Sequence, residues 1–365
     1  MTRHAVVIGA GIGGIAAASA LARTGWRVTV LERAARLGEV GAGISVWPDA
    51  LRVLTGLGAD LRADSLLSGA AGVRRPDGRW LAEVDTSRFD PPVMVHRARL
   101  HEAIVRTIGD DAEIRTGVTV TGVEPDGAVL TATERLTADL IVAADGIRSG
   151  VRQALHPEHA EPRYSGYTAY RGIAPALTGT GGETWGRGQR FGWVPLIDGR
   201  VYWYATANVG AGTAQPDSAH ADATRLFAGW HDPIPELVAA TESVLQNDIY
   251  DLPLPLATFA VNRVALLGDA AHAMTPNLGR GACTAIEDAA SLARLLAAHR
   301  DDIATALEEY DAERRPHATK LIRRSRLVGD LGQLENRAAL AARDTALRII
   351  GLVTGPRARR ASQHV

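Results

Sequence analysis

The sequence is poor in cysteine and lacks long apolar runs. Its single cysteine, Cys283, excludes an intramolecular disulfide and a cysteine-rich metal site. No stretch reaches the roughly 18 consecutive apolar residues of a membrane-spanning helix. The eleven histidines include no i, i+4 pair with a third ligand, so we predict no metal site. These absences favour a cytoplasmic protein without a membrane span.

Two catalytic motifs are also missing. The only lysine, Lys320, lies in no G-x-x-x-x-G-K-[ST] pattern, and no G-x-S-x-G pattern occurs, so phosphoryl-transfer and hydrolase functions have no support. The formal net charge of −1 gives no overall attraction for nucleic acid or anionic membrane. With 365 residues, 46% of them hydrophobic, the chain is long enough for about two globular domains.

The N-terminal segment has the pattern of a βαβ unit. Residues 4–8 predict a buried strand, 13–24 a helix of small residues, and 27–31 a second strand parallel to the first. Further along, the patterns predict helices over 48–54, 97–108, 281–298, 302–328 and 333–350 and strands over 70–75, 79–84, 118–123, 139–143 and 264–268.

The texture changes between residues 164 and 207, where aromatic and β-branched runs alternate with glycine-rich turns. We predict an antiparallel sheet there, followed by helices over 220–229 and 234–246. The chain is therefore predicted to be an α/β protein with a discontinuous first domain (1–71, 97–161 and 255–300), an inserted sheet domain (72–96 and 162–254) and a C-terminal helical segment (301–365). The arginine-rich helices of that segment are either a partner surface or solvated faces.

A dinucleotide-binding fingerprint follows the first predicted strand. In Gly9-Ala10-Gly11-Ile12-Gly13-Gly14, Gly9 makes the tight turn, Gly11 admits a pyrophosphate, and Gly14 allows close packing of helix and strand. Glu32, at the end of the second strand, can accept hydrogen bonds from ribose hydroxyls. The next residue, Arg33, can stack over an adenine. The fingerprint alone leaves NAD and FAD open, and a glycine-rich turn without a ligand is the alternative.

Two later motifs repeat the arrangement of an acid or glycine after a buried strand. Asp145 lies in Ala144-Asp145-Gly146, and Asp269 lies in the Gly268-Asp269-Ala270-Ala271-His272 segment. The latter continues through Pro276 to Gly279-Arg280-Gly281-Ala282, which opens a predicted helix. A helix N-terminus of this kind can hold an anion.

These three motifs, in this order and spacing, resemble the class A flavoprotein aromatic hydroxylases, the p-hydroxybenzoate hydroxylase superfamily, over nearly the whole chain. The short chain length and the residues of these motifs are most similar to those of the small salicylate-, urate- and quinolone-hydroxylase-like members. The resemblance implies a Rossmann-type FAD-binding domain with an inserted antiparallel substrate sheet, non-covalent FAD, and NAD(P)H that docks transiently without a Rossmann unit of its own.

The resemblance also assigns residues to the cofactor. Gly9, Gly11 and Gly14 would hold the pyrophosphate, and Glu32 and Arg33 the adenosine. The remaining assignments are Arg97 on the flavin, Asp145 where FAD meets the NAD(P)H path, Asp269 on the ribityl and pyrophosphate region, and Gly279, Gly281 and Ala282 at the flavin N1–C2=O edge. Arg280 replaces a glutamine of many relatives, and its side chain faces either the flavin or solvent.

The predicted sheet carries the substrate side. Strand alternation places Phe191 with Trp193 on one face and Tyr202 with Tyr204 on one face, while leaving open which face looks at the flavin. Arg171 either pairs with a substrate anion or lies at the surface. A base, if one is needed, is Tyr202, Tyr204 or His272; His272 is alternatively bonded to the backbone. The resemblance places Pro276 beside the flavin C4a edge.

The predicted function is that of an FAD-dependent monooxygenase. NAD(P)H would reduce FAD, and O₂ would give a flavin C4a-hydroperoxide that transfers one oxygen atom to an electron-rich, aromatic or polycyclic small molecule. The nearer alternative is an FAD-dependent reductase or dehydrogenase on the same fold, and the farther one is a non-catalytic FAD-binding protein. We expect no nucleic-acid partner and a monomer or homodimer.

Overall fold

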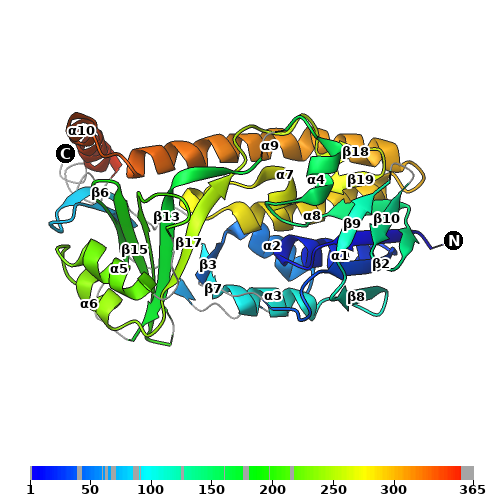
Figure 1. Ribbon diagram of the computed structural model, residues 1–365, viewed down its shortest axis with the longest axis horizontal. Helices are drawn as coiled ribbons and strands as arrows, with labels where there is room; N and C mark the ends of the chain where they lie inside the picture. The colour runs from blue at the N-terminus through cyan, green and yellow to red at the C-terminus, as the bar shows by residue number, and fades with distance from the viewer. Residues whose placement is uncertain are drawn as a thin grey trace, which may run out of the picture.

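The computed structural model describes residues 2–38, 43–59, 61, 65–66, 71–84, 90, 92–124, 127–159, 161–175, 181–196, 198–213 and 218–354. Figure 1 shows two parts side by side, with one long helix, α9 (Ile303–Gly332), running along both. Part of the predicted C-terminal segment, 355–365, lies outside the described residues.

The first part is built on a six-stranded sheet. Its order is β18 (Ala260–Val261), β19 (Val264–Leu266), β12 (Leu140–Ala143), β1 (His4–Ile8), β2 (Arg27–Glu32) and β8 (Ala112–Thr116). All neighbours pair in parallel except β18 with β19. The predicted strands at 4–8, 27–31, 139–143 and 264–268 are confirmed within two residues. The edge strand β8 was not predicted, because its sequence AEIRT carries two charged residues and no buried run.

Helices of small residues pack against this sheet. The helix α1 (Ile12–Arg23) is buried over nine of its twelve residues, and its alanines let it lie close to β1 and to α8 (Gly281–Ala298). α3 (Arg97–Val105) also packs on α1. The predicted helices 13–24, 97–108 and 281–298 are thus confirmed, the second ending three residues early.

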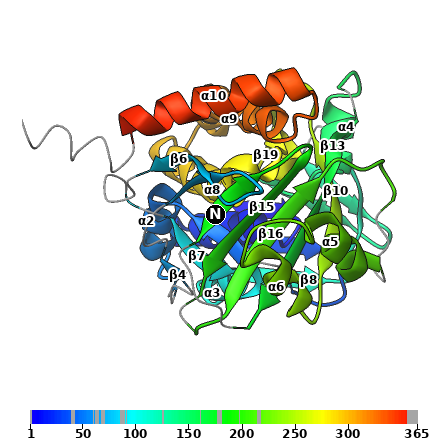
Figure 2. The same ribbon diagram turned by 90° about the vertical axis from the view of Figure 1, so that its left-hand side faces the viewer.

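The second part is a seven-stranded sheet, and Figure 2 shows several of its strands from the front. Its order is β17 (Leu245–Asp251), β13 (Arg163–Ala174), β16 (Val201–Ala207), β15 (Gln189–Pro195), β14 (Gly182–Trp185), β5 (Ala71–Arg74) and β6 (Trp80–Val84). Neighbours pair antiparallel except β14 with β5. The helices α5 (Ala219–Phe227) and α6 (Ile234–Ala239) cover one face, as Figure 2 shows.

One predicted helix is wrong in its second half. We expected a helix over 234–246, but α6 ends at Ala239 and β17 begins at Leu245. The segment LQNDIYD gains backbone hydrogen bonds by pairing with β13, and this tertiary pairing overrides its weak local preference.

The remaining elements form two smaller sheets and several helices. One three-stranded sheet contains β3 (Gly43–Val46), β7 (Val93–His96) and β4 (Ser65–Leu66), and a second contains β9 (Val120–Val123), β10 (Ala128–Thr131) and β11 (Arg135–Thr137). The predicted strand at 118–123 is β9. The remaining elements are α2 (Pro48–Gly56), α4 (Gly150–Leu155), α7 (Asp269–His272), the 3₁₀ helix η3 (Pro276–Leu278) and α10 (Arg337–Thr354).

Sheet membership bears on the domain division. We placed 72–96 with the substrate sheet; β5 and β6 pair there, but β7 pairs with β3 and β4 instead. We therefore propose the predicted two-domain division with β7 assigned to the boundary. Among the described residues, no helix is long and apolar enough to cross a membrane.

Candidate functional site

The turn between β1 and α1 is closed by glycines that tolerate no side chain. Gly9 has φ +100°, and a Cβ atom there would lie 2.4 Å from the carbonyl oxygen of Ala144. A Cβ at Gly14 would lie 1.9 Å from the carbonyl oxygen of Gly9. No side chain caps α1 at Gly11, and its first turn contains no acid. The first N–H groups of α1 are therefore available to a phosphate group.

Glu32 and a histidine that the sequence did not single out hold this turn. Glu32 Oε2 accepts the N–H of Ala10 at 2.7 Å, and its Oε1 accepts the N–H of Ala34 at 2.8 Å. The Nε2 atom of buried His101 lies 2.6 Å from the carbonyl oxygen of Ala10. Each carboxylate oxygen keeps a further lone pair for a ribose hydroxyl. Arg33 is exposed beside Glu32.

The two later motifs lie at the same sheet edge. β1, β12 and β19 are parallel neighbours, so their carboxyl ends bring Gly9, Asp145 and Asp269 together. Asp145 Oδ2 accepts the N–H of Val151 at 3.4 Å, while its Oδ1 is buried without a partner among the described residues. Asp269 is exposed at the start of α7. The orphaned oxygen of Asp145 suits a ligand that donates hydroxyl or N–H groups.

The segment before α8 forms a second open helix N-terminus. Gly279 adopts a left-handed conformation with φ +59°, and no side chain caps α8, whose first turn contains Gly281 and Ala282 and no acid. The Arg280 side chain is neither fully buried in the site nor fully exposed to solvent. It is 18% exposed, pairs with Glu287 at 3.3 Å, and lies 5.3 Å from the Trp47 ring centre.

Two further predicted residues flank this region. Arg97 is exposed at the first position of α3, directly after β7. Pro276 is exposed at the start of η3, four residues before Arg280. The structure thus leaves both side chains accessible, and their roles stay predictions.

The structure resolves which face of the large sheet looks toward the first part. Phe191, Trp193 and Trp203 pack under α5 and α6, with the rings of Phe191 and Trp203 stacked 5.2 Å apart. Tyr202 and Tyr204 lie on the opposite face. A Cβ at Gly43 of β3 would lie 2.9 Å from Tyr202. The predicted pairing of faces is confirmed, and the tyrosine face is the one next to the β3 strand.

A buried polar network on this face escaped the sequence analysis. Arg190 donates to Glu183 Oε1 at 2.5 Å and to Asn277 Oδ1 at 2.6 Å. Tyr204 donates to the same Glu183 oxygen at 3.2 Å. The Nε atom of Arg190 is buried without a partner in the described part of the chain. The only sign of this network in the sequence is that Arg190 stands at an inward-facing position of its strand.

Arg171 lies on the same face, opposite Tyr204 in the strand pairing. Its guanidinium donates to Asn247 Oδ1 at 3.4 Å, and it is half-buried. Burial raises the pKa of the Tyr202 phenol, and Arg171 opposes that rise in part. Burial raises the pKa of Tyr204 far above its usual value, and the Glu183 carboxylate adds to the effect. Both phenols therefore stay protonated at neutral pH and favour hydrogen-bond donation over action as a base.

His272 lies away from this face. It is fully buried, and its Nε2 atom lies 2.5 Å from Asp288 Oδ2, which also accepts the N–H of Gly268 at 3.2 Å. Asp288 in turn pairs with Arg314 at 2.7 Å. This placement favours a structural role in joining α7, α8 and α9 over a catalytic one.

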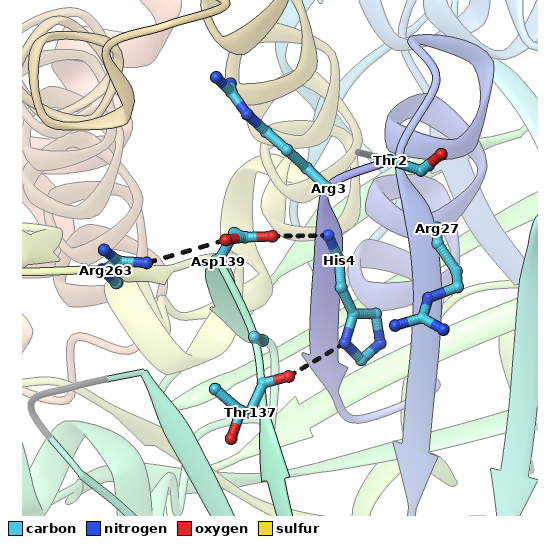
Figure 3. A pocket seen from close by; sticks show the side chains of 8 residues that line it. Thr2, Arg3, His4, Arg27, Thr137, Asp139 and Arg263 are labelled. Atoms are coloured by element: carbon cyan, nitrogen blue, oxygen red, sulfur yellow. Dashed lines mark hydrogen bonds and ion pairs between the residues drawn. The ribbon is translucent and has the colours of Figure 1, made fainter.

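A basic pocket at the other end of the sheet is separate from this site. It is lined by Arg3, Arg27 and Arg263 with His4 and Asp139, at the amino ends of β1 and β2 (Figure 3). Ligands of open α/β sheets bind outside the carboxyl ends of the strands. Arg263 lies 3.9 Å from Asp139, which accepts the N–H of His4 at 2.9 Å. No group of three potential metal ligands occurs among the described residues.

The carboxyl-end site fits FAD in its chemistry. Two uncapped helix N-termini suit the pyrophosphate and the flavin edge, Glu32 and the orphaned Asp145 oxygen suit hydroxyl donors, and the turn at Gly9 leaves no room for side chains. A family model described as an FAD binding domain matches residues 2–325. The chain belongs to this FAD-binding family, and within it to the class A flavoprotein aromatic hydroxylases.

Individual relatives cover almost the whole chain. The aurachin C monooxygenase/isomerase of Stigmatella aurantiaca is 37% identical over 363 residues and 94% of each chain. The 2-heptyl-3-hydroxy-4(1H)-quinolone synthase of Pseudomonas aeruginosa is 32% identical over 94% of each chain. The crystal structure of Klebsiella pneumoniae HpxO complexed with FAD and uric acid superposes with a TM-score of 0.84 at 30% identity, over 97% of each chain.

Proposed function

We propose that this FAD-dependent monooxygenase oxygenates a planar nitrogen heteroaromatic that carries a ring carbonyl or hydroxyl group. The observation that carries the proposal is the juxtaposition of the FAD-binding sheet edge, through β3, with the Tyr202 and Tyr204 face. The names of two relatives, a quinolone synthase and a protein complexed with uric acid, point to ligands of this class.

The tyrosine face has the properties that such a substrate needs. Met94, Val194 and Tyr202 form an apolar cluster, joined at its margin by Ile173, Leu196 and Tyr204. A flat apolar surface excludes water and receives a planar ring. Arg171, whose guanidinium donates to the neutral amide of Asn247, adds positive charge at this face, whereas Arg190 is paired with Glu183. The charge of Arg171 favours an enolate or carbonyl oxygen over a cation.

The roles of the chain's own residues follow from their protonation. The protonated phenol of Tyr202 would donate a hydrogen bond to the substrate oxygen, and Arg171 would stabilise its ionised form. Tyr204, which already donates to Glu183, would form part of the wall beside it. Bound FAD, once reduced by NAD(P)H, would supply the chemistry that activates O₂, and O₂ would be the source of the transferred oxygen atom. Because Arg171 would lower the pKa of a bound hydroxyl group, the substrate could lose its proton without a dedicated protein base.

The comparisons favour oxygen transfer over the reductase alternative, since the relatives reported above include a monooxygenase. The choice of NADH or NADPH, the cytoplasmic location and a monomeric or dimeric state stay predictions.

The test uses the purified, FAD-loaded protein with isotopically labelled O₂. A 4-quinolone, urate and salicylate are supplied in turn with NADH or NADPH, and products are analysed by mass spectrometry. Incorporation of one labelled oxygen atom into a heteroaromatic supports the proposal. Incorporation into salicylate alone overturns the substrate class, and substrate-independent NAD(P)H oxidation that yields only hydrogen peroxide overturns oxygen transfer.

A pair of matched variants locates the substrate face. Tyr202→Phe removes a donor from the proposed face, and we expect roughly a tenfold or greater loss in kcat/KM. Tyr164→Phe, in the same sheet, removes a hydroxyl that donates to the carbonyl oxygen of Val209 at 2.7 Å, and we expect near wild-type activity. Equal effects of the two variants contradict the assigned face.

A further inference from the structure

Trp47 and Arg280 lie together at the flavin end of the site. The backbone N–H of Trp47, at the start of α2, points to the Sγ atom of Cys283 in α8 at 3.4 Å. The Arg280 guanidinium lies over the Trp47 ring, and a Cβ at Gly279 would lie 4.0 Å from Trp47 Nε1. The two side chains therefore border the open N-terminus of α8.

Their position along the site is set by the neighbouring elements. A Cβ at Gly13 of α1 would lie 3.0 Å from Ala285 of α8, so the two open helix N-termini are neighbours. From α8 the surface continues through Ser45 and Gly43 of β3 to Tyr202 of the substrate face. A cofactor with its pyrophosphate at α1 would present its far end, the flavin ring, between α8 and Tyr202.

Both residues carry a buried hydrogen-bond donor without an acceptor. Trp47 Nε1 and Arg280 Nε are inaccessible to solvent and have no partner among the residues that the structure describes. Buried N–H groups are nearly always paired. Two unpaired donors on touching side chains, beside an uncapped helix N-terminus, point to an acceptor that the bound ligand supplies.

The charges around Arg280 explain how it can act on such a ligand. Its guanidinium lies 3.3 Å from Glu287 and 3.8 Å from the exposed Asp49. Glu287 is shared with Arg314 at 3.2 Å and with His317 at 3.7 Å, so it does not neutralise Arg280 alone. Arg280 therefore keeps part of its positive charge at the helix N-terminus, where Asp49 weakens it from the solvent side.

We propose that Arg280 and Trp47 donate to the pyrimidine edge of the flavin and that Arg280 raises the two-electron reduction potential of the bound FAD. The inference rests on the proposed function only through FAD binding. Two-electron reduction places negative charge on this edge, so a fixed cation there stabilises reduced over oxidised flavin. Trp47 contributes a neutral donor, which strengthens FAD binding in both states.

The experiment measures the reduction potential and the dissociation constant of FAD in the intact protein. For Arg280→Gln we expect at least a tenfold loss of preference for reduced FAD, a fall of about 30 mV for a two-electron couple. Asp49→Asn removes the opposing charge at an exposed position, and we expect the potential to rise. Trp47→Phe is expected to weaken FAD binding several-fold in both redox states, with the potential unchanged.

Two controls keep the outcomes separate. Arg294→Gln removes a cation from the exposed side of the same helix, and we expect no change in potential. Arg280→Lys keeps the charge, so its flavin reduction potential should equal that of the wild type. This variant tests the inference if Arg280→Gln is poorly folded. Equal potentials for wild type, Arg280→Gln and Asp49→Asn, with FAD bound, overturn the inference and leave the monooxygenase proposal standing. A wild-type protein that binds no FAD overturns both.

Discussion

The carboxylate of Glu32 accepts the N–H of Ala10 at 2.7 Å, across the turn that opens α1. One side chain thus shapes the glycine turn, and we predict that it also binds the adenosine ribose. We expect Glu32→Ala to weaken FAD binding about 10- to 100-fold, because bonds to a charged acceptor contribute about 1.5–3 kcal/mol. Quenching of flavin fluorescence on binding measures the change.

A neighbouring acid provides the control for this variant. Glu113 lies on the adjoining strand β8, is exposed, and pairs with Arg115 at 2.9 Å. Glu113→Ala should leave FAD affinity at the wild-type value. Full FAD affinity in Glu32→Ala would remove Glu32 from the cofactor site.

Gly14 is expected to tolerate no side chain. A Cβ there meets the backbone oxygen of Gly9 at 1.9 Å, so α1 must move away from β1. We expect Gly14→Ala to lower the free energy of unfolding by about 3 kcal/mol or more. Gly56→Ala, in α2 with no atom within 4 Å, should be neutral or slightly stabilising. Urea unfolding compares the two; equal stability would contradict the close packing.

The sequence predicted the parts of the site that depend on local geometry. The turn at Gly9 and the helix N-termini follow from spacing within one βαβ unit, and Asp145 and Asp269 follow from their place after buried strands. The network of Arg190, Glu183 and Asn277 could not be predicted, because it joins residues 87 and 7 positions apart through tertiary packing. The strand β17 was missed for the same reason.

The environment of Arg280 shows the same limit. Its sequence position left two orientations open, and only the packing of α2 against α8 reveals that the guanidinium lies over Trp47. The sequence alone was enough to identify Arg280 as unusual for its position. Its partner Asp49 could not be identified in this way, since that contact crosses most of the chain.

Cys283 is expected to be an unreactive thiol in the folded protein. Burial raises the pKa of Cys283 to about 11. At about pH 8, roughly one thiol in a thousand is then ionised, and the thiolate is the reactive form. Iodoacetamide should label the native protein slowly and the urea-unfolded protein fast. Because the chain has no second cysteine, the signal is assigned without ambiguity; rapid native labelling would contradict the burial.

The pair of Glu183 and Arg190 is expected to be a major source of stability in the substrate sheet. Arg190 is 5% exposed, so removal of its partner leaves a buried charge unpaired. We expect Glu183→Ala to cost about 3–5 kcal/mol in the free energy of unfolding. Asp198→Asn breaks an exposed pair of similar length, with Arg200 at 2.6 Å, and should cost less than about 1 kcal/mol. Equal costs would show that burial of Arg190 has no energetic effect.

The pair of His272 and Asp288 predicts a pH dependence of stability. Burial alone would lower the pKa of His272, but the Asp288 carboxylate at 2.5 Å outweighs it and raises that pKa above its usual value. A raised folded-state pKa contributes stability that is present below about pH 6.5 and is lost as pH rises through the raised value. Burial would raise the pKa of Asp288, yet His272 and Arg314 hold it below the usual range, so this contribution is lost in acid instead.

His272→Gln tests this dependence and separates structure from catalysis. We expect the stability difference between wild type and variant to be largest between about pH 4 and 6.5 and to shrink as pH rises further. Urea unfolding from pH 5 to 9 measures it, and a difference that grows with pH contradicts the pairing. If His272 were instead the catalytic base, the variant would lose the acidic limb of the kcat profile, where protonation of the base lowers activity, while its stability difference stayed flat. The 0% exposure of His272 favours the first outcome, because a side chain without access to the substrate face cannot take its proton.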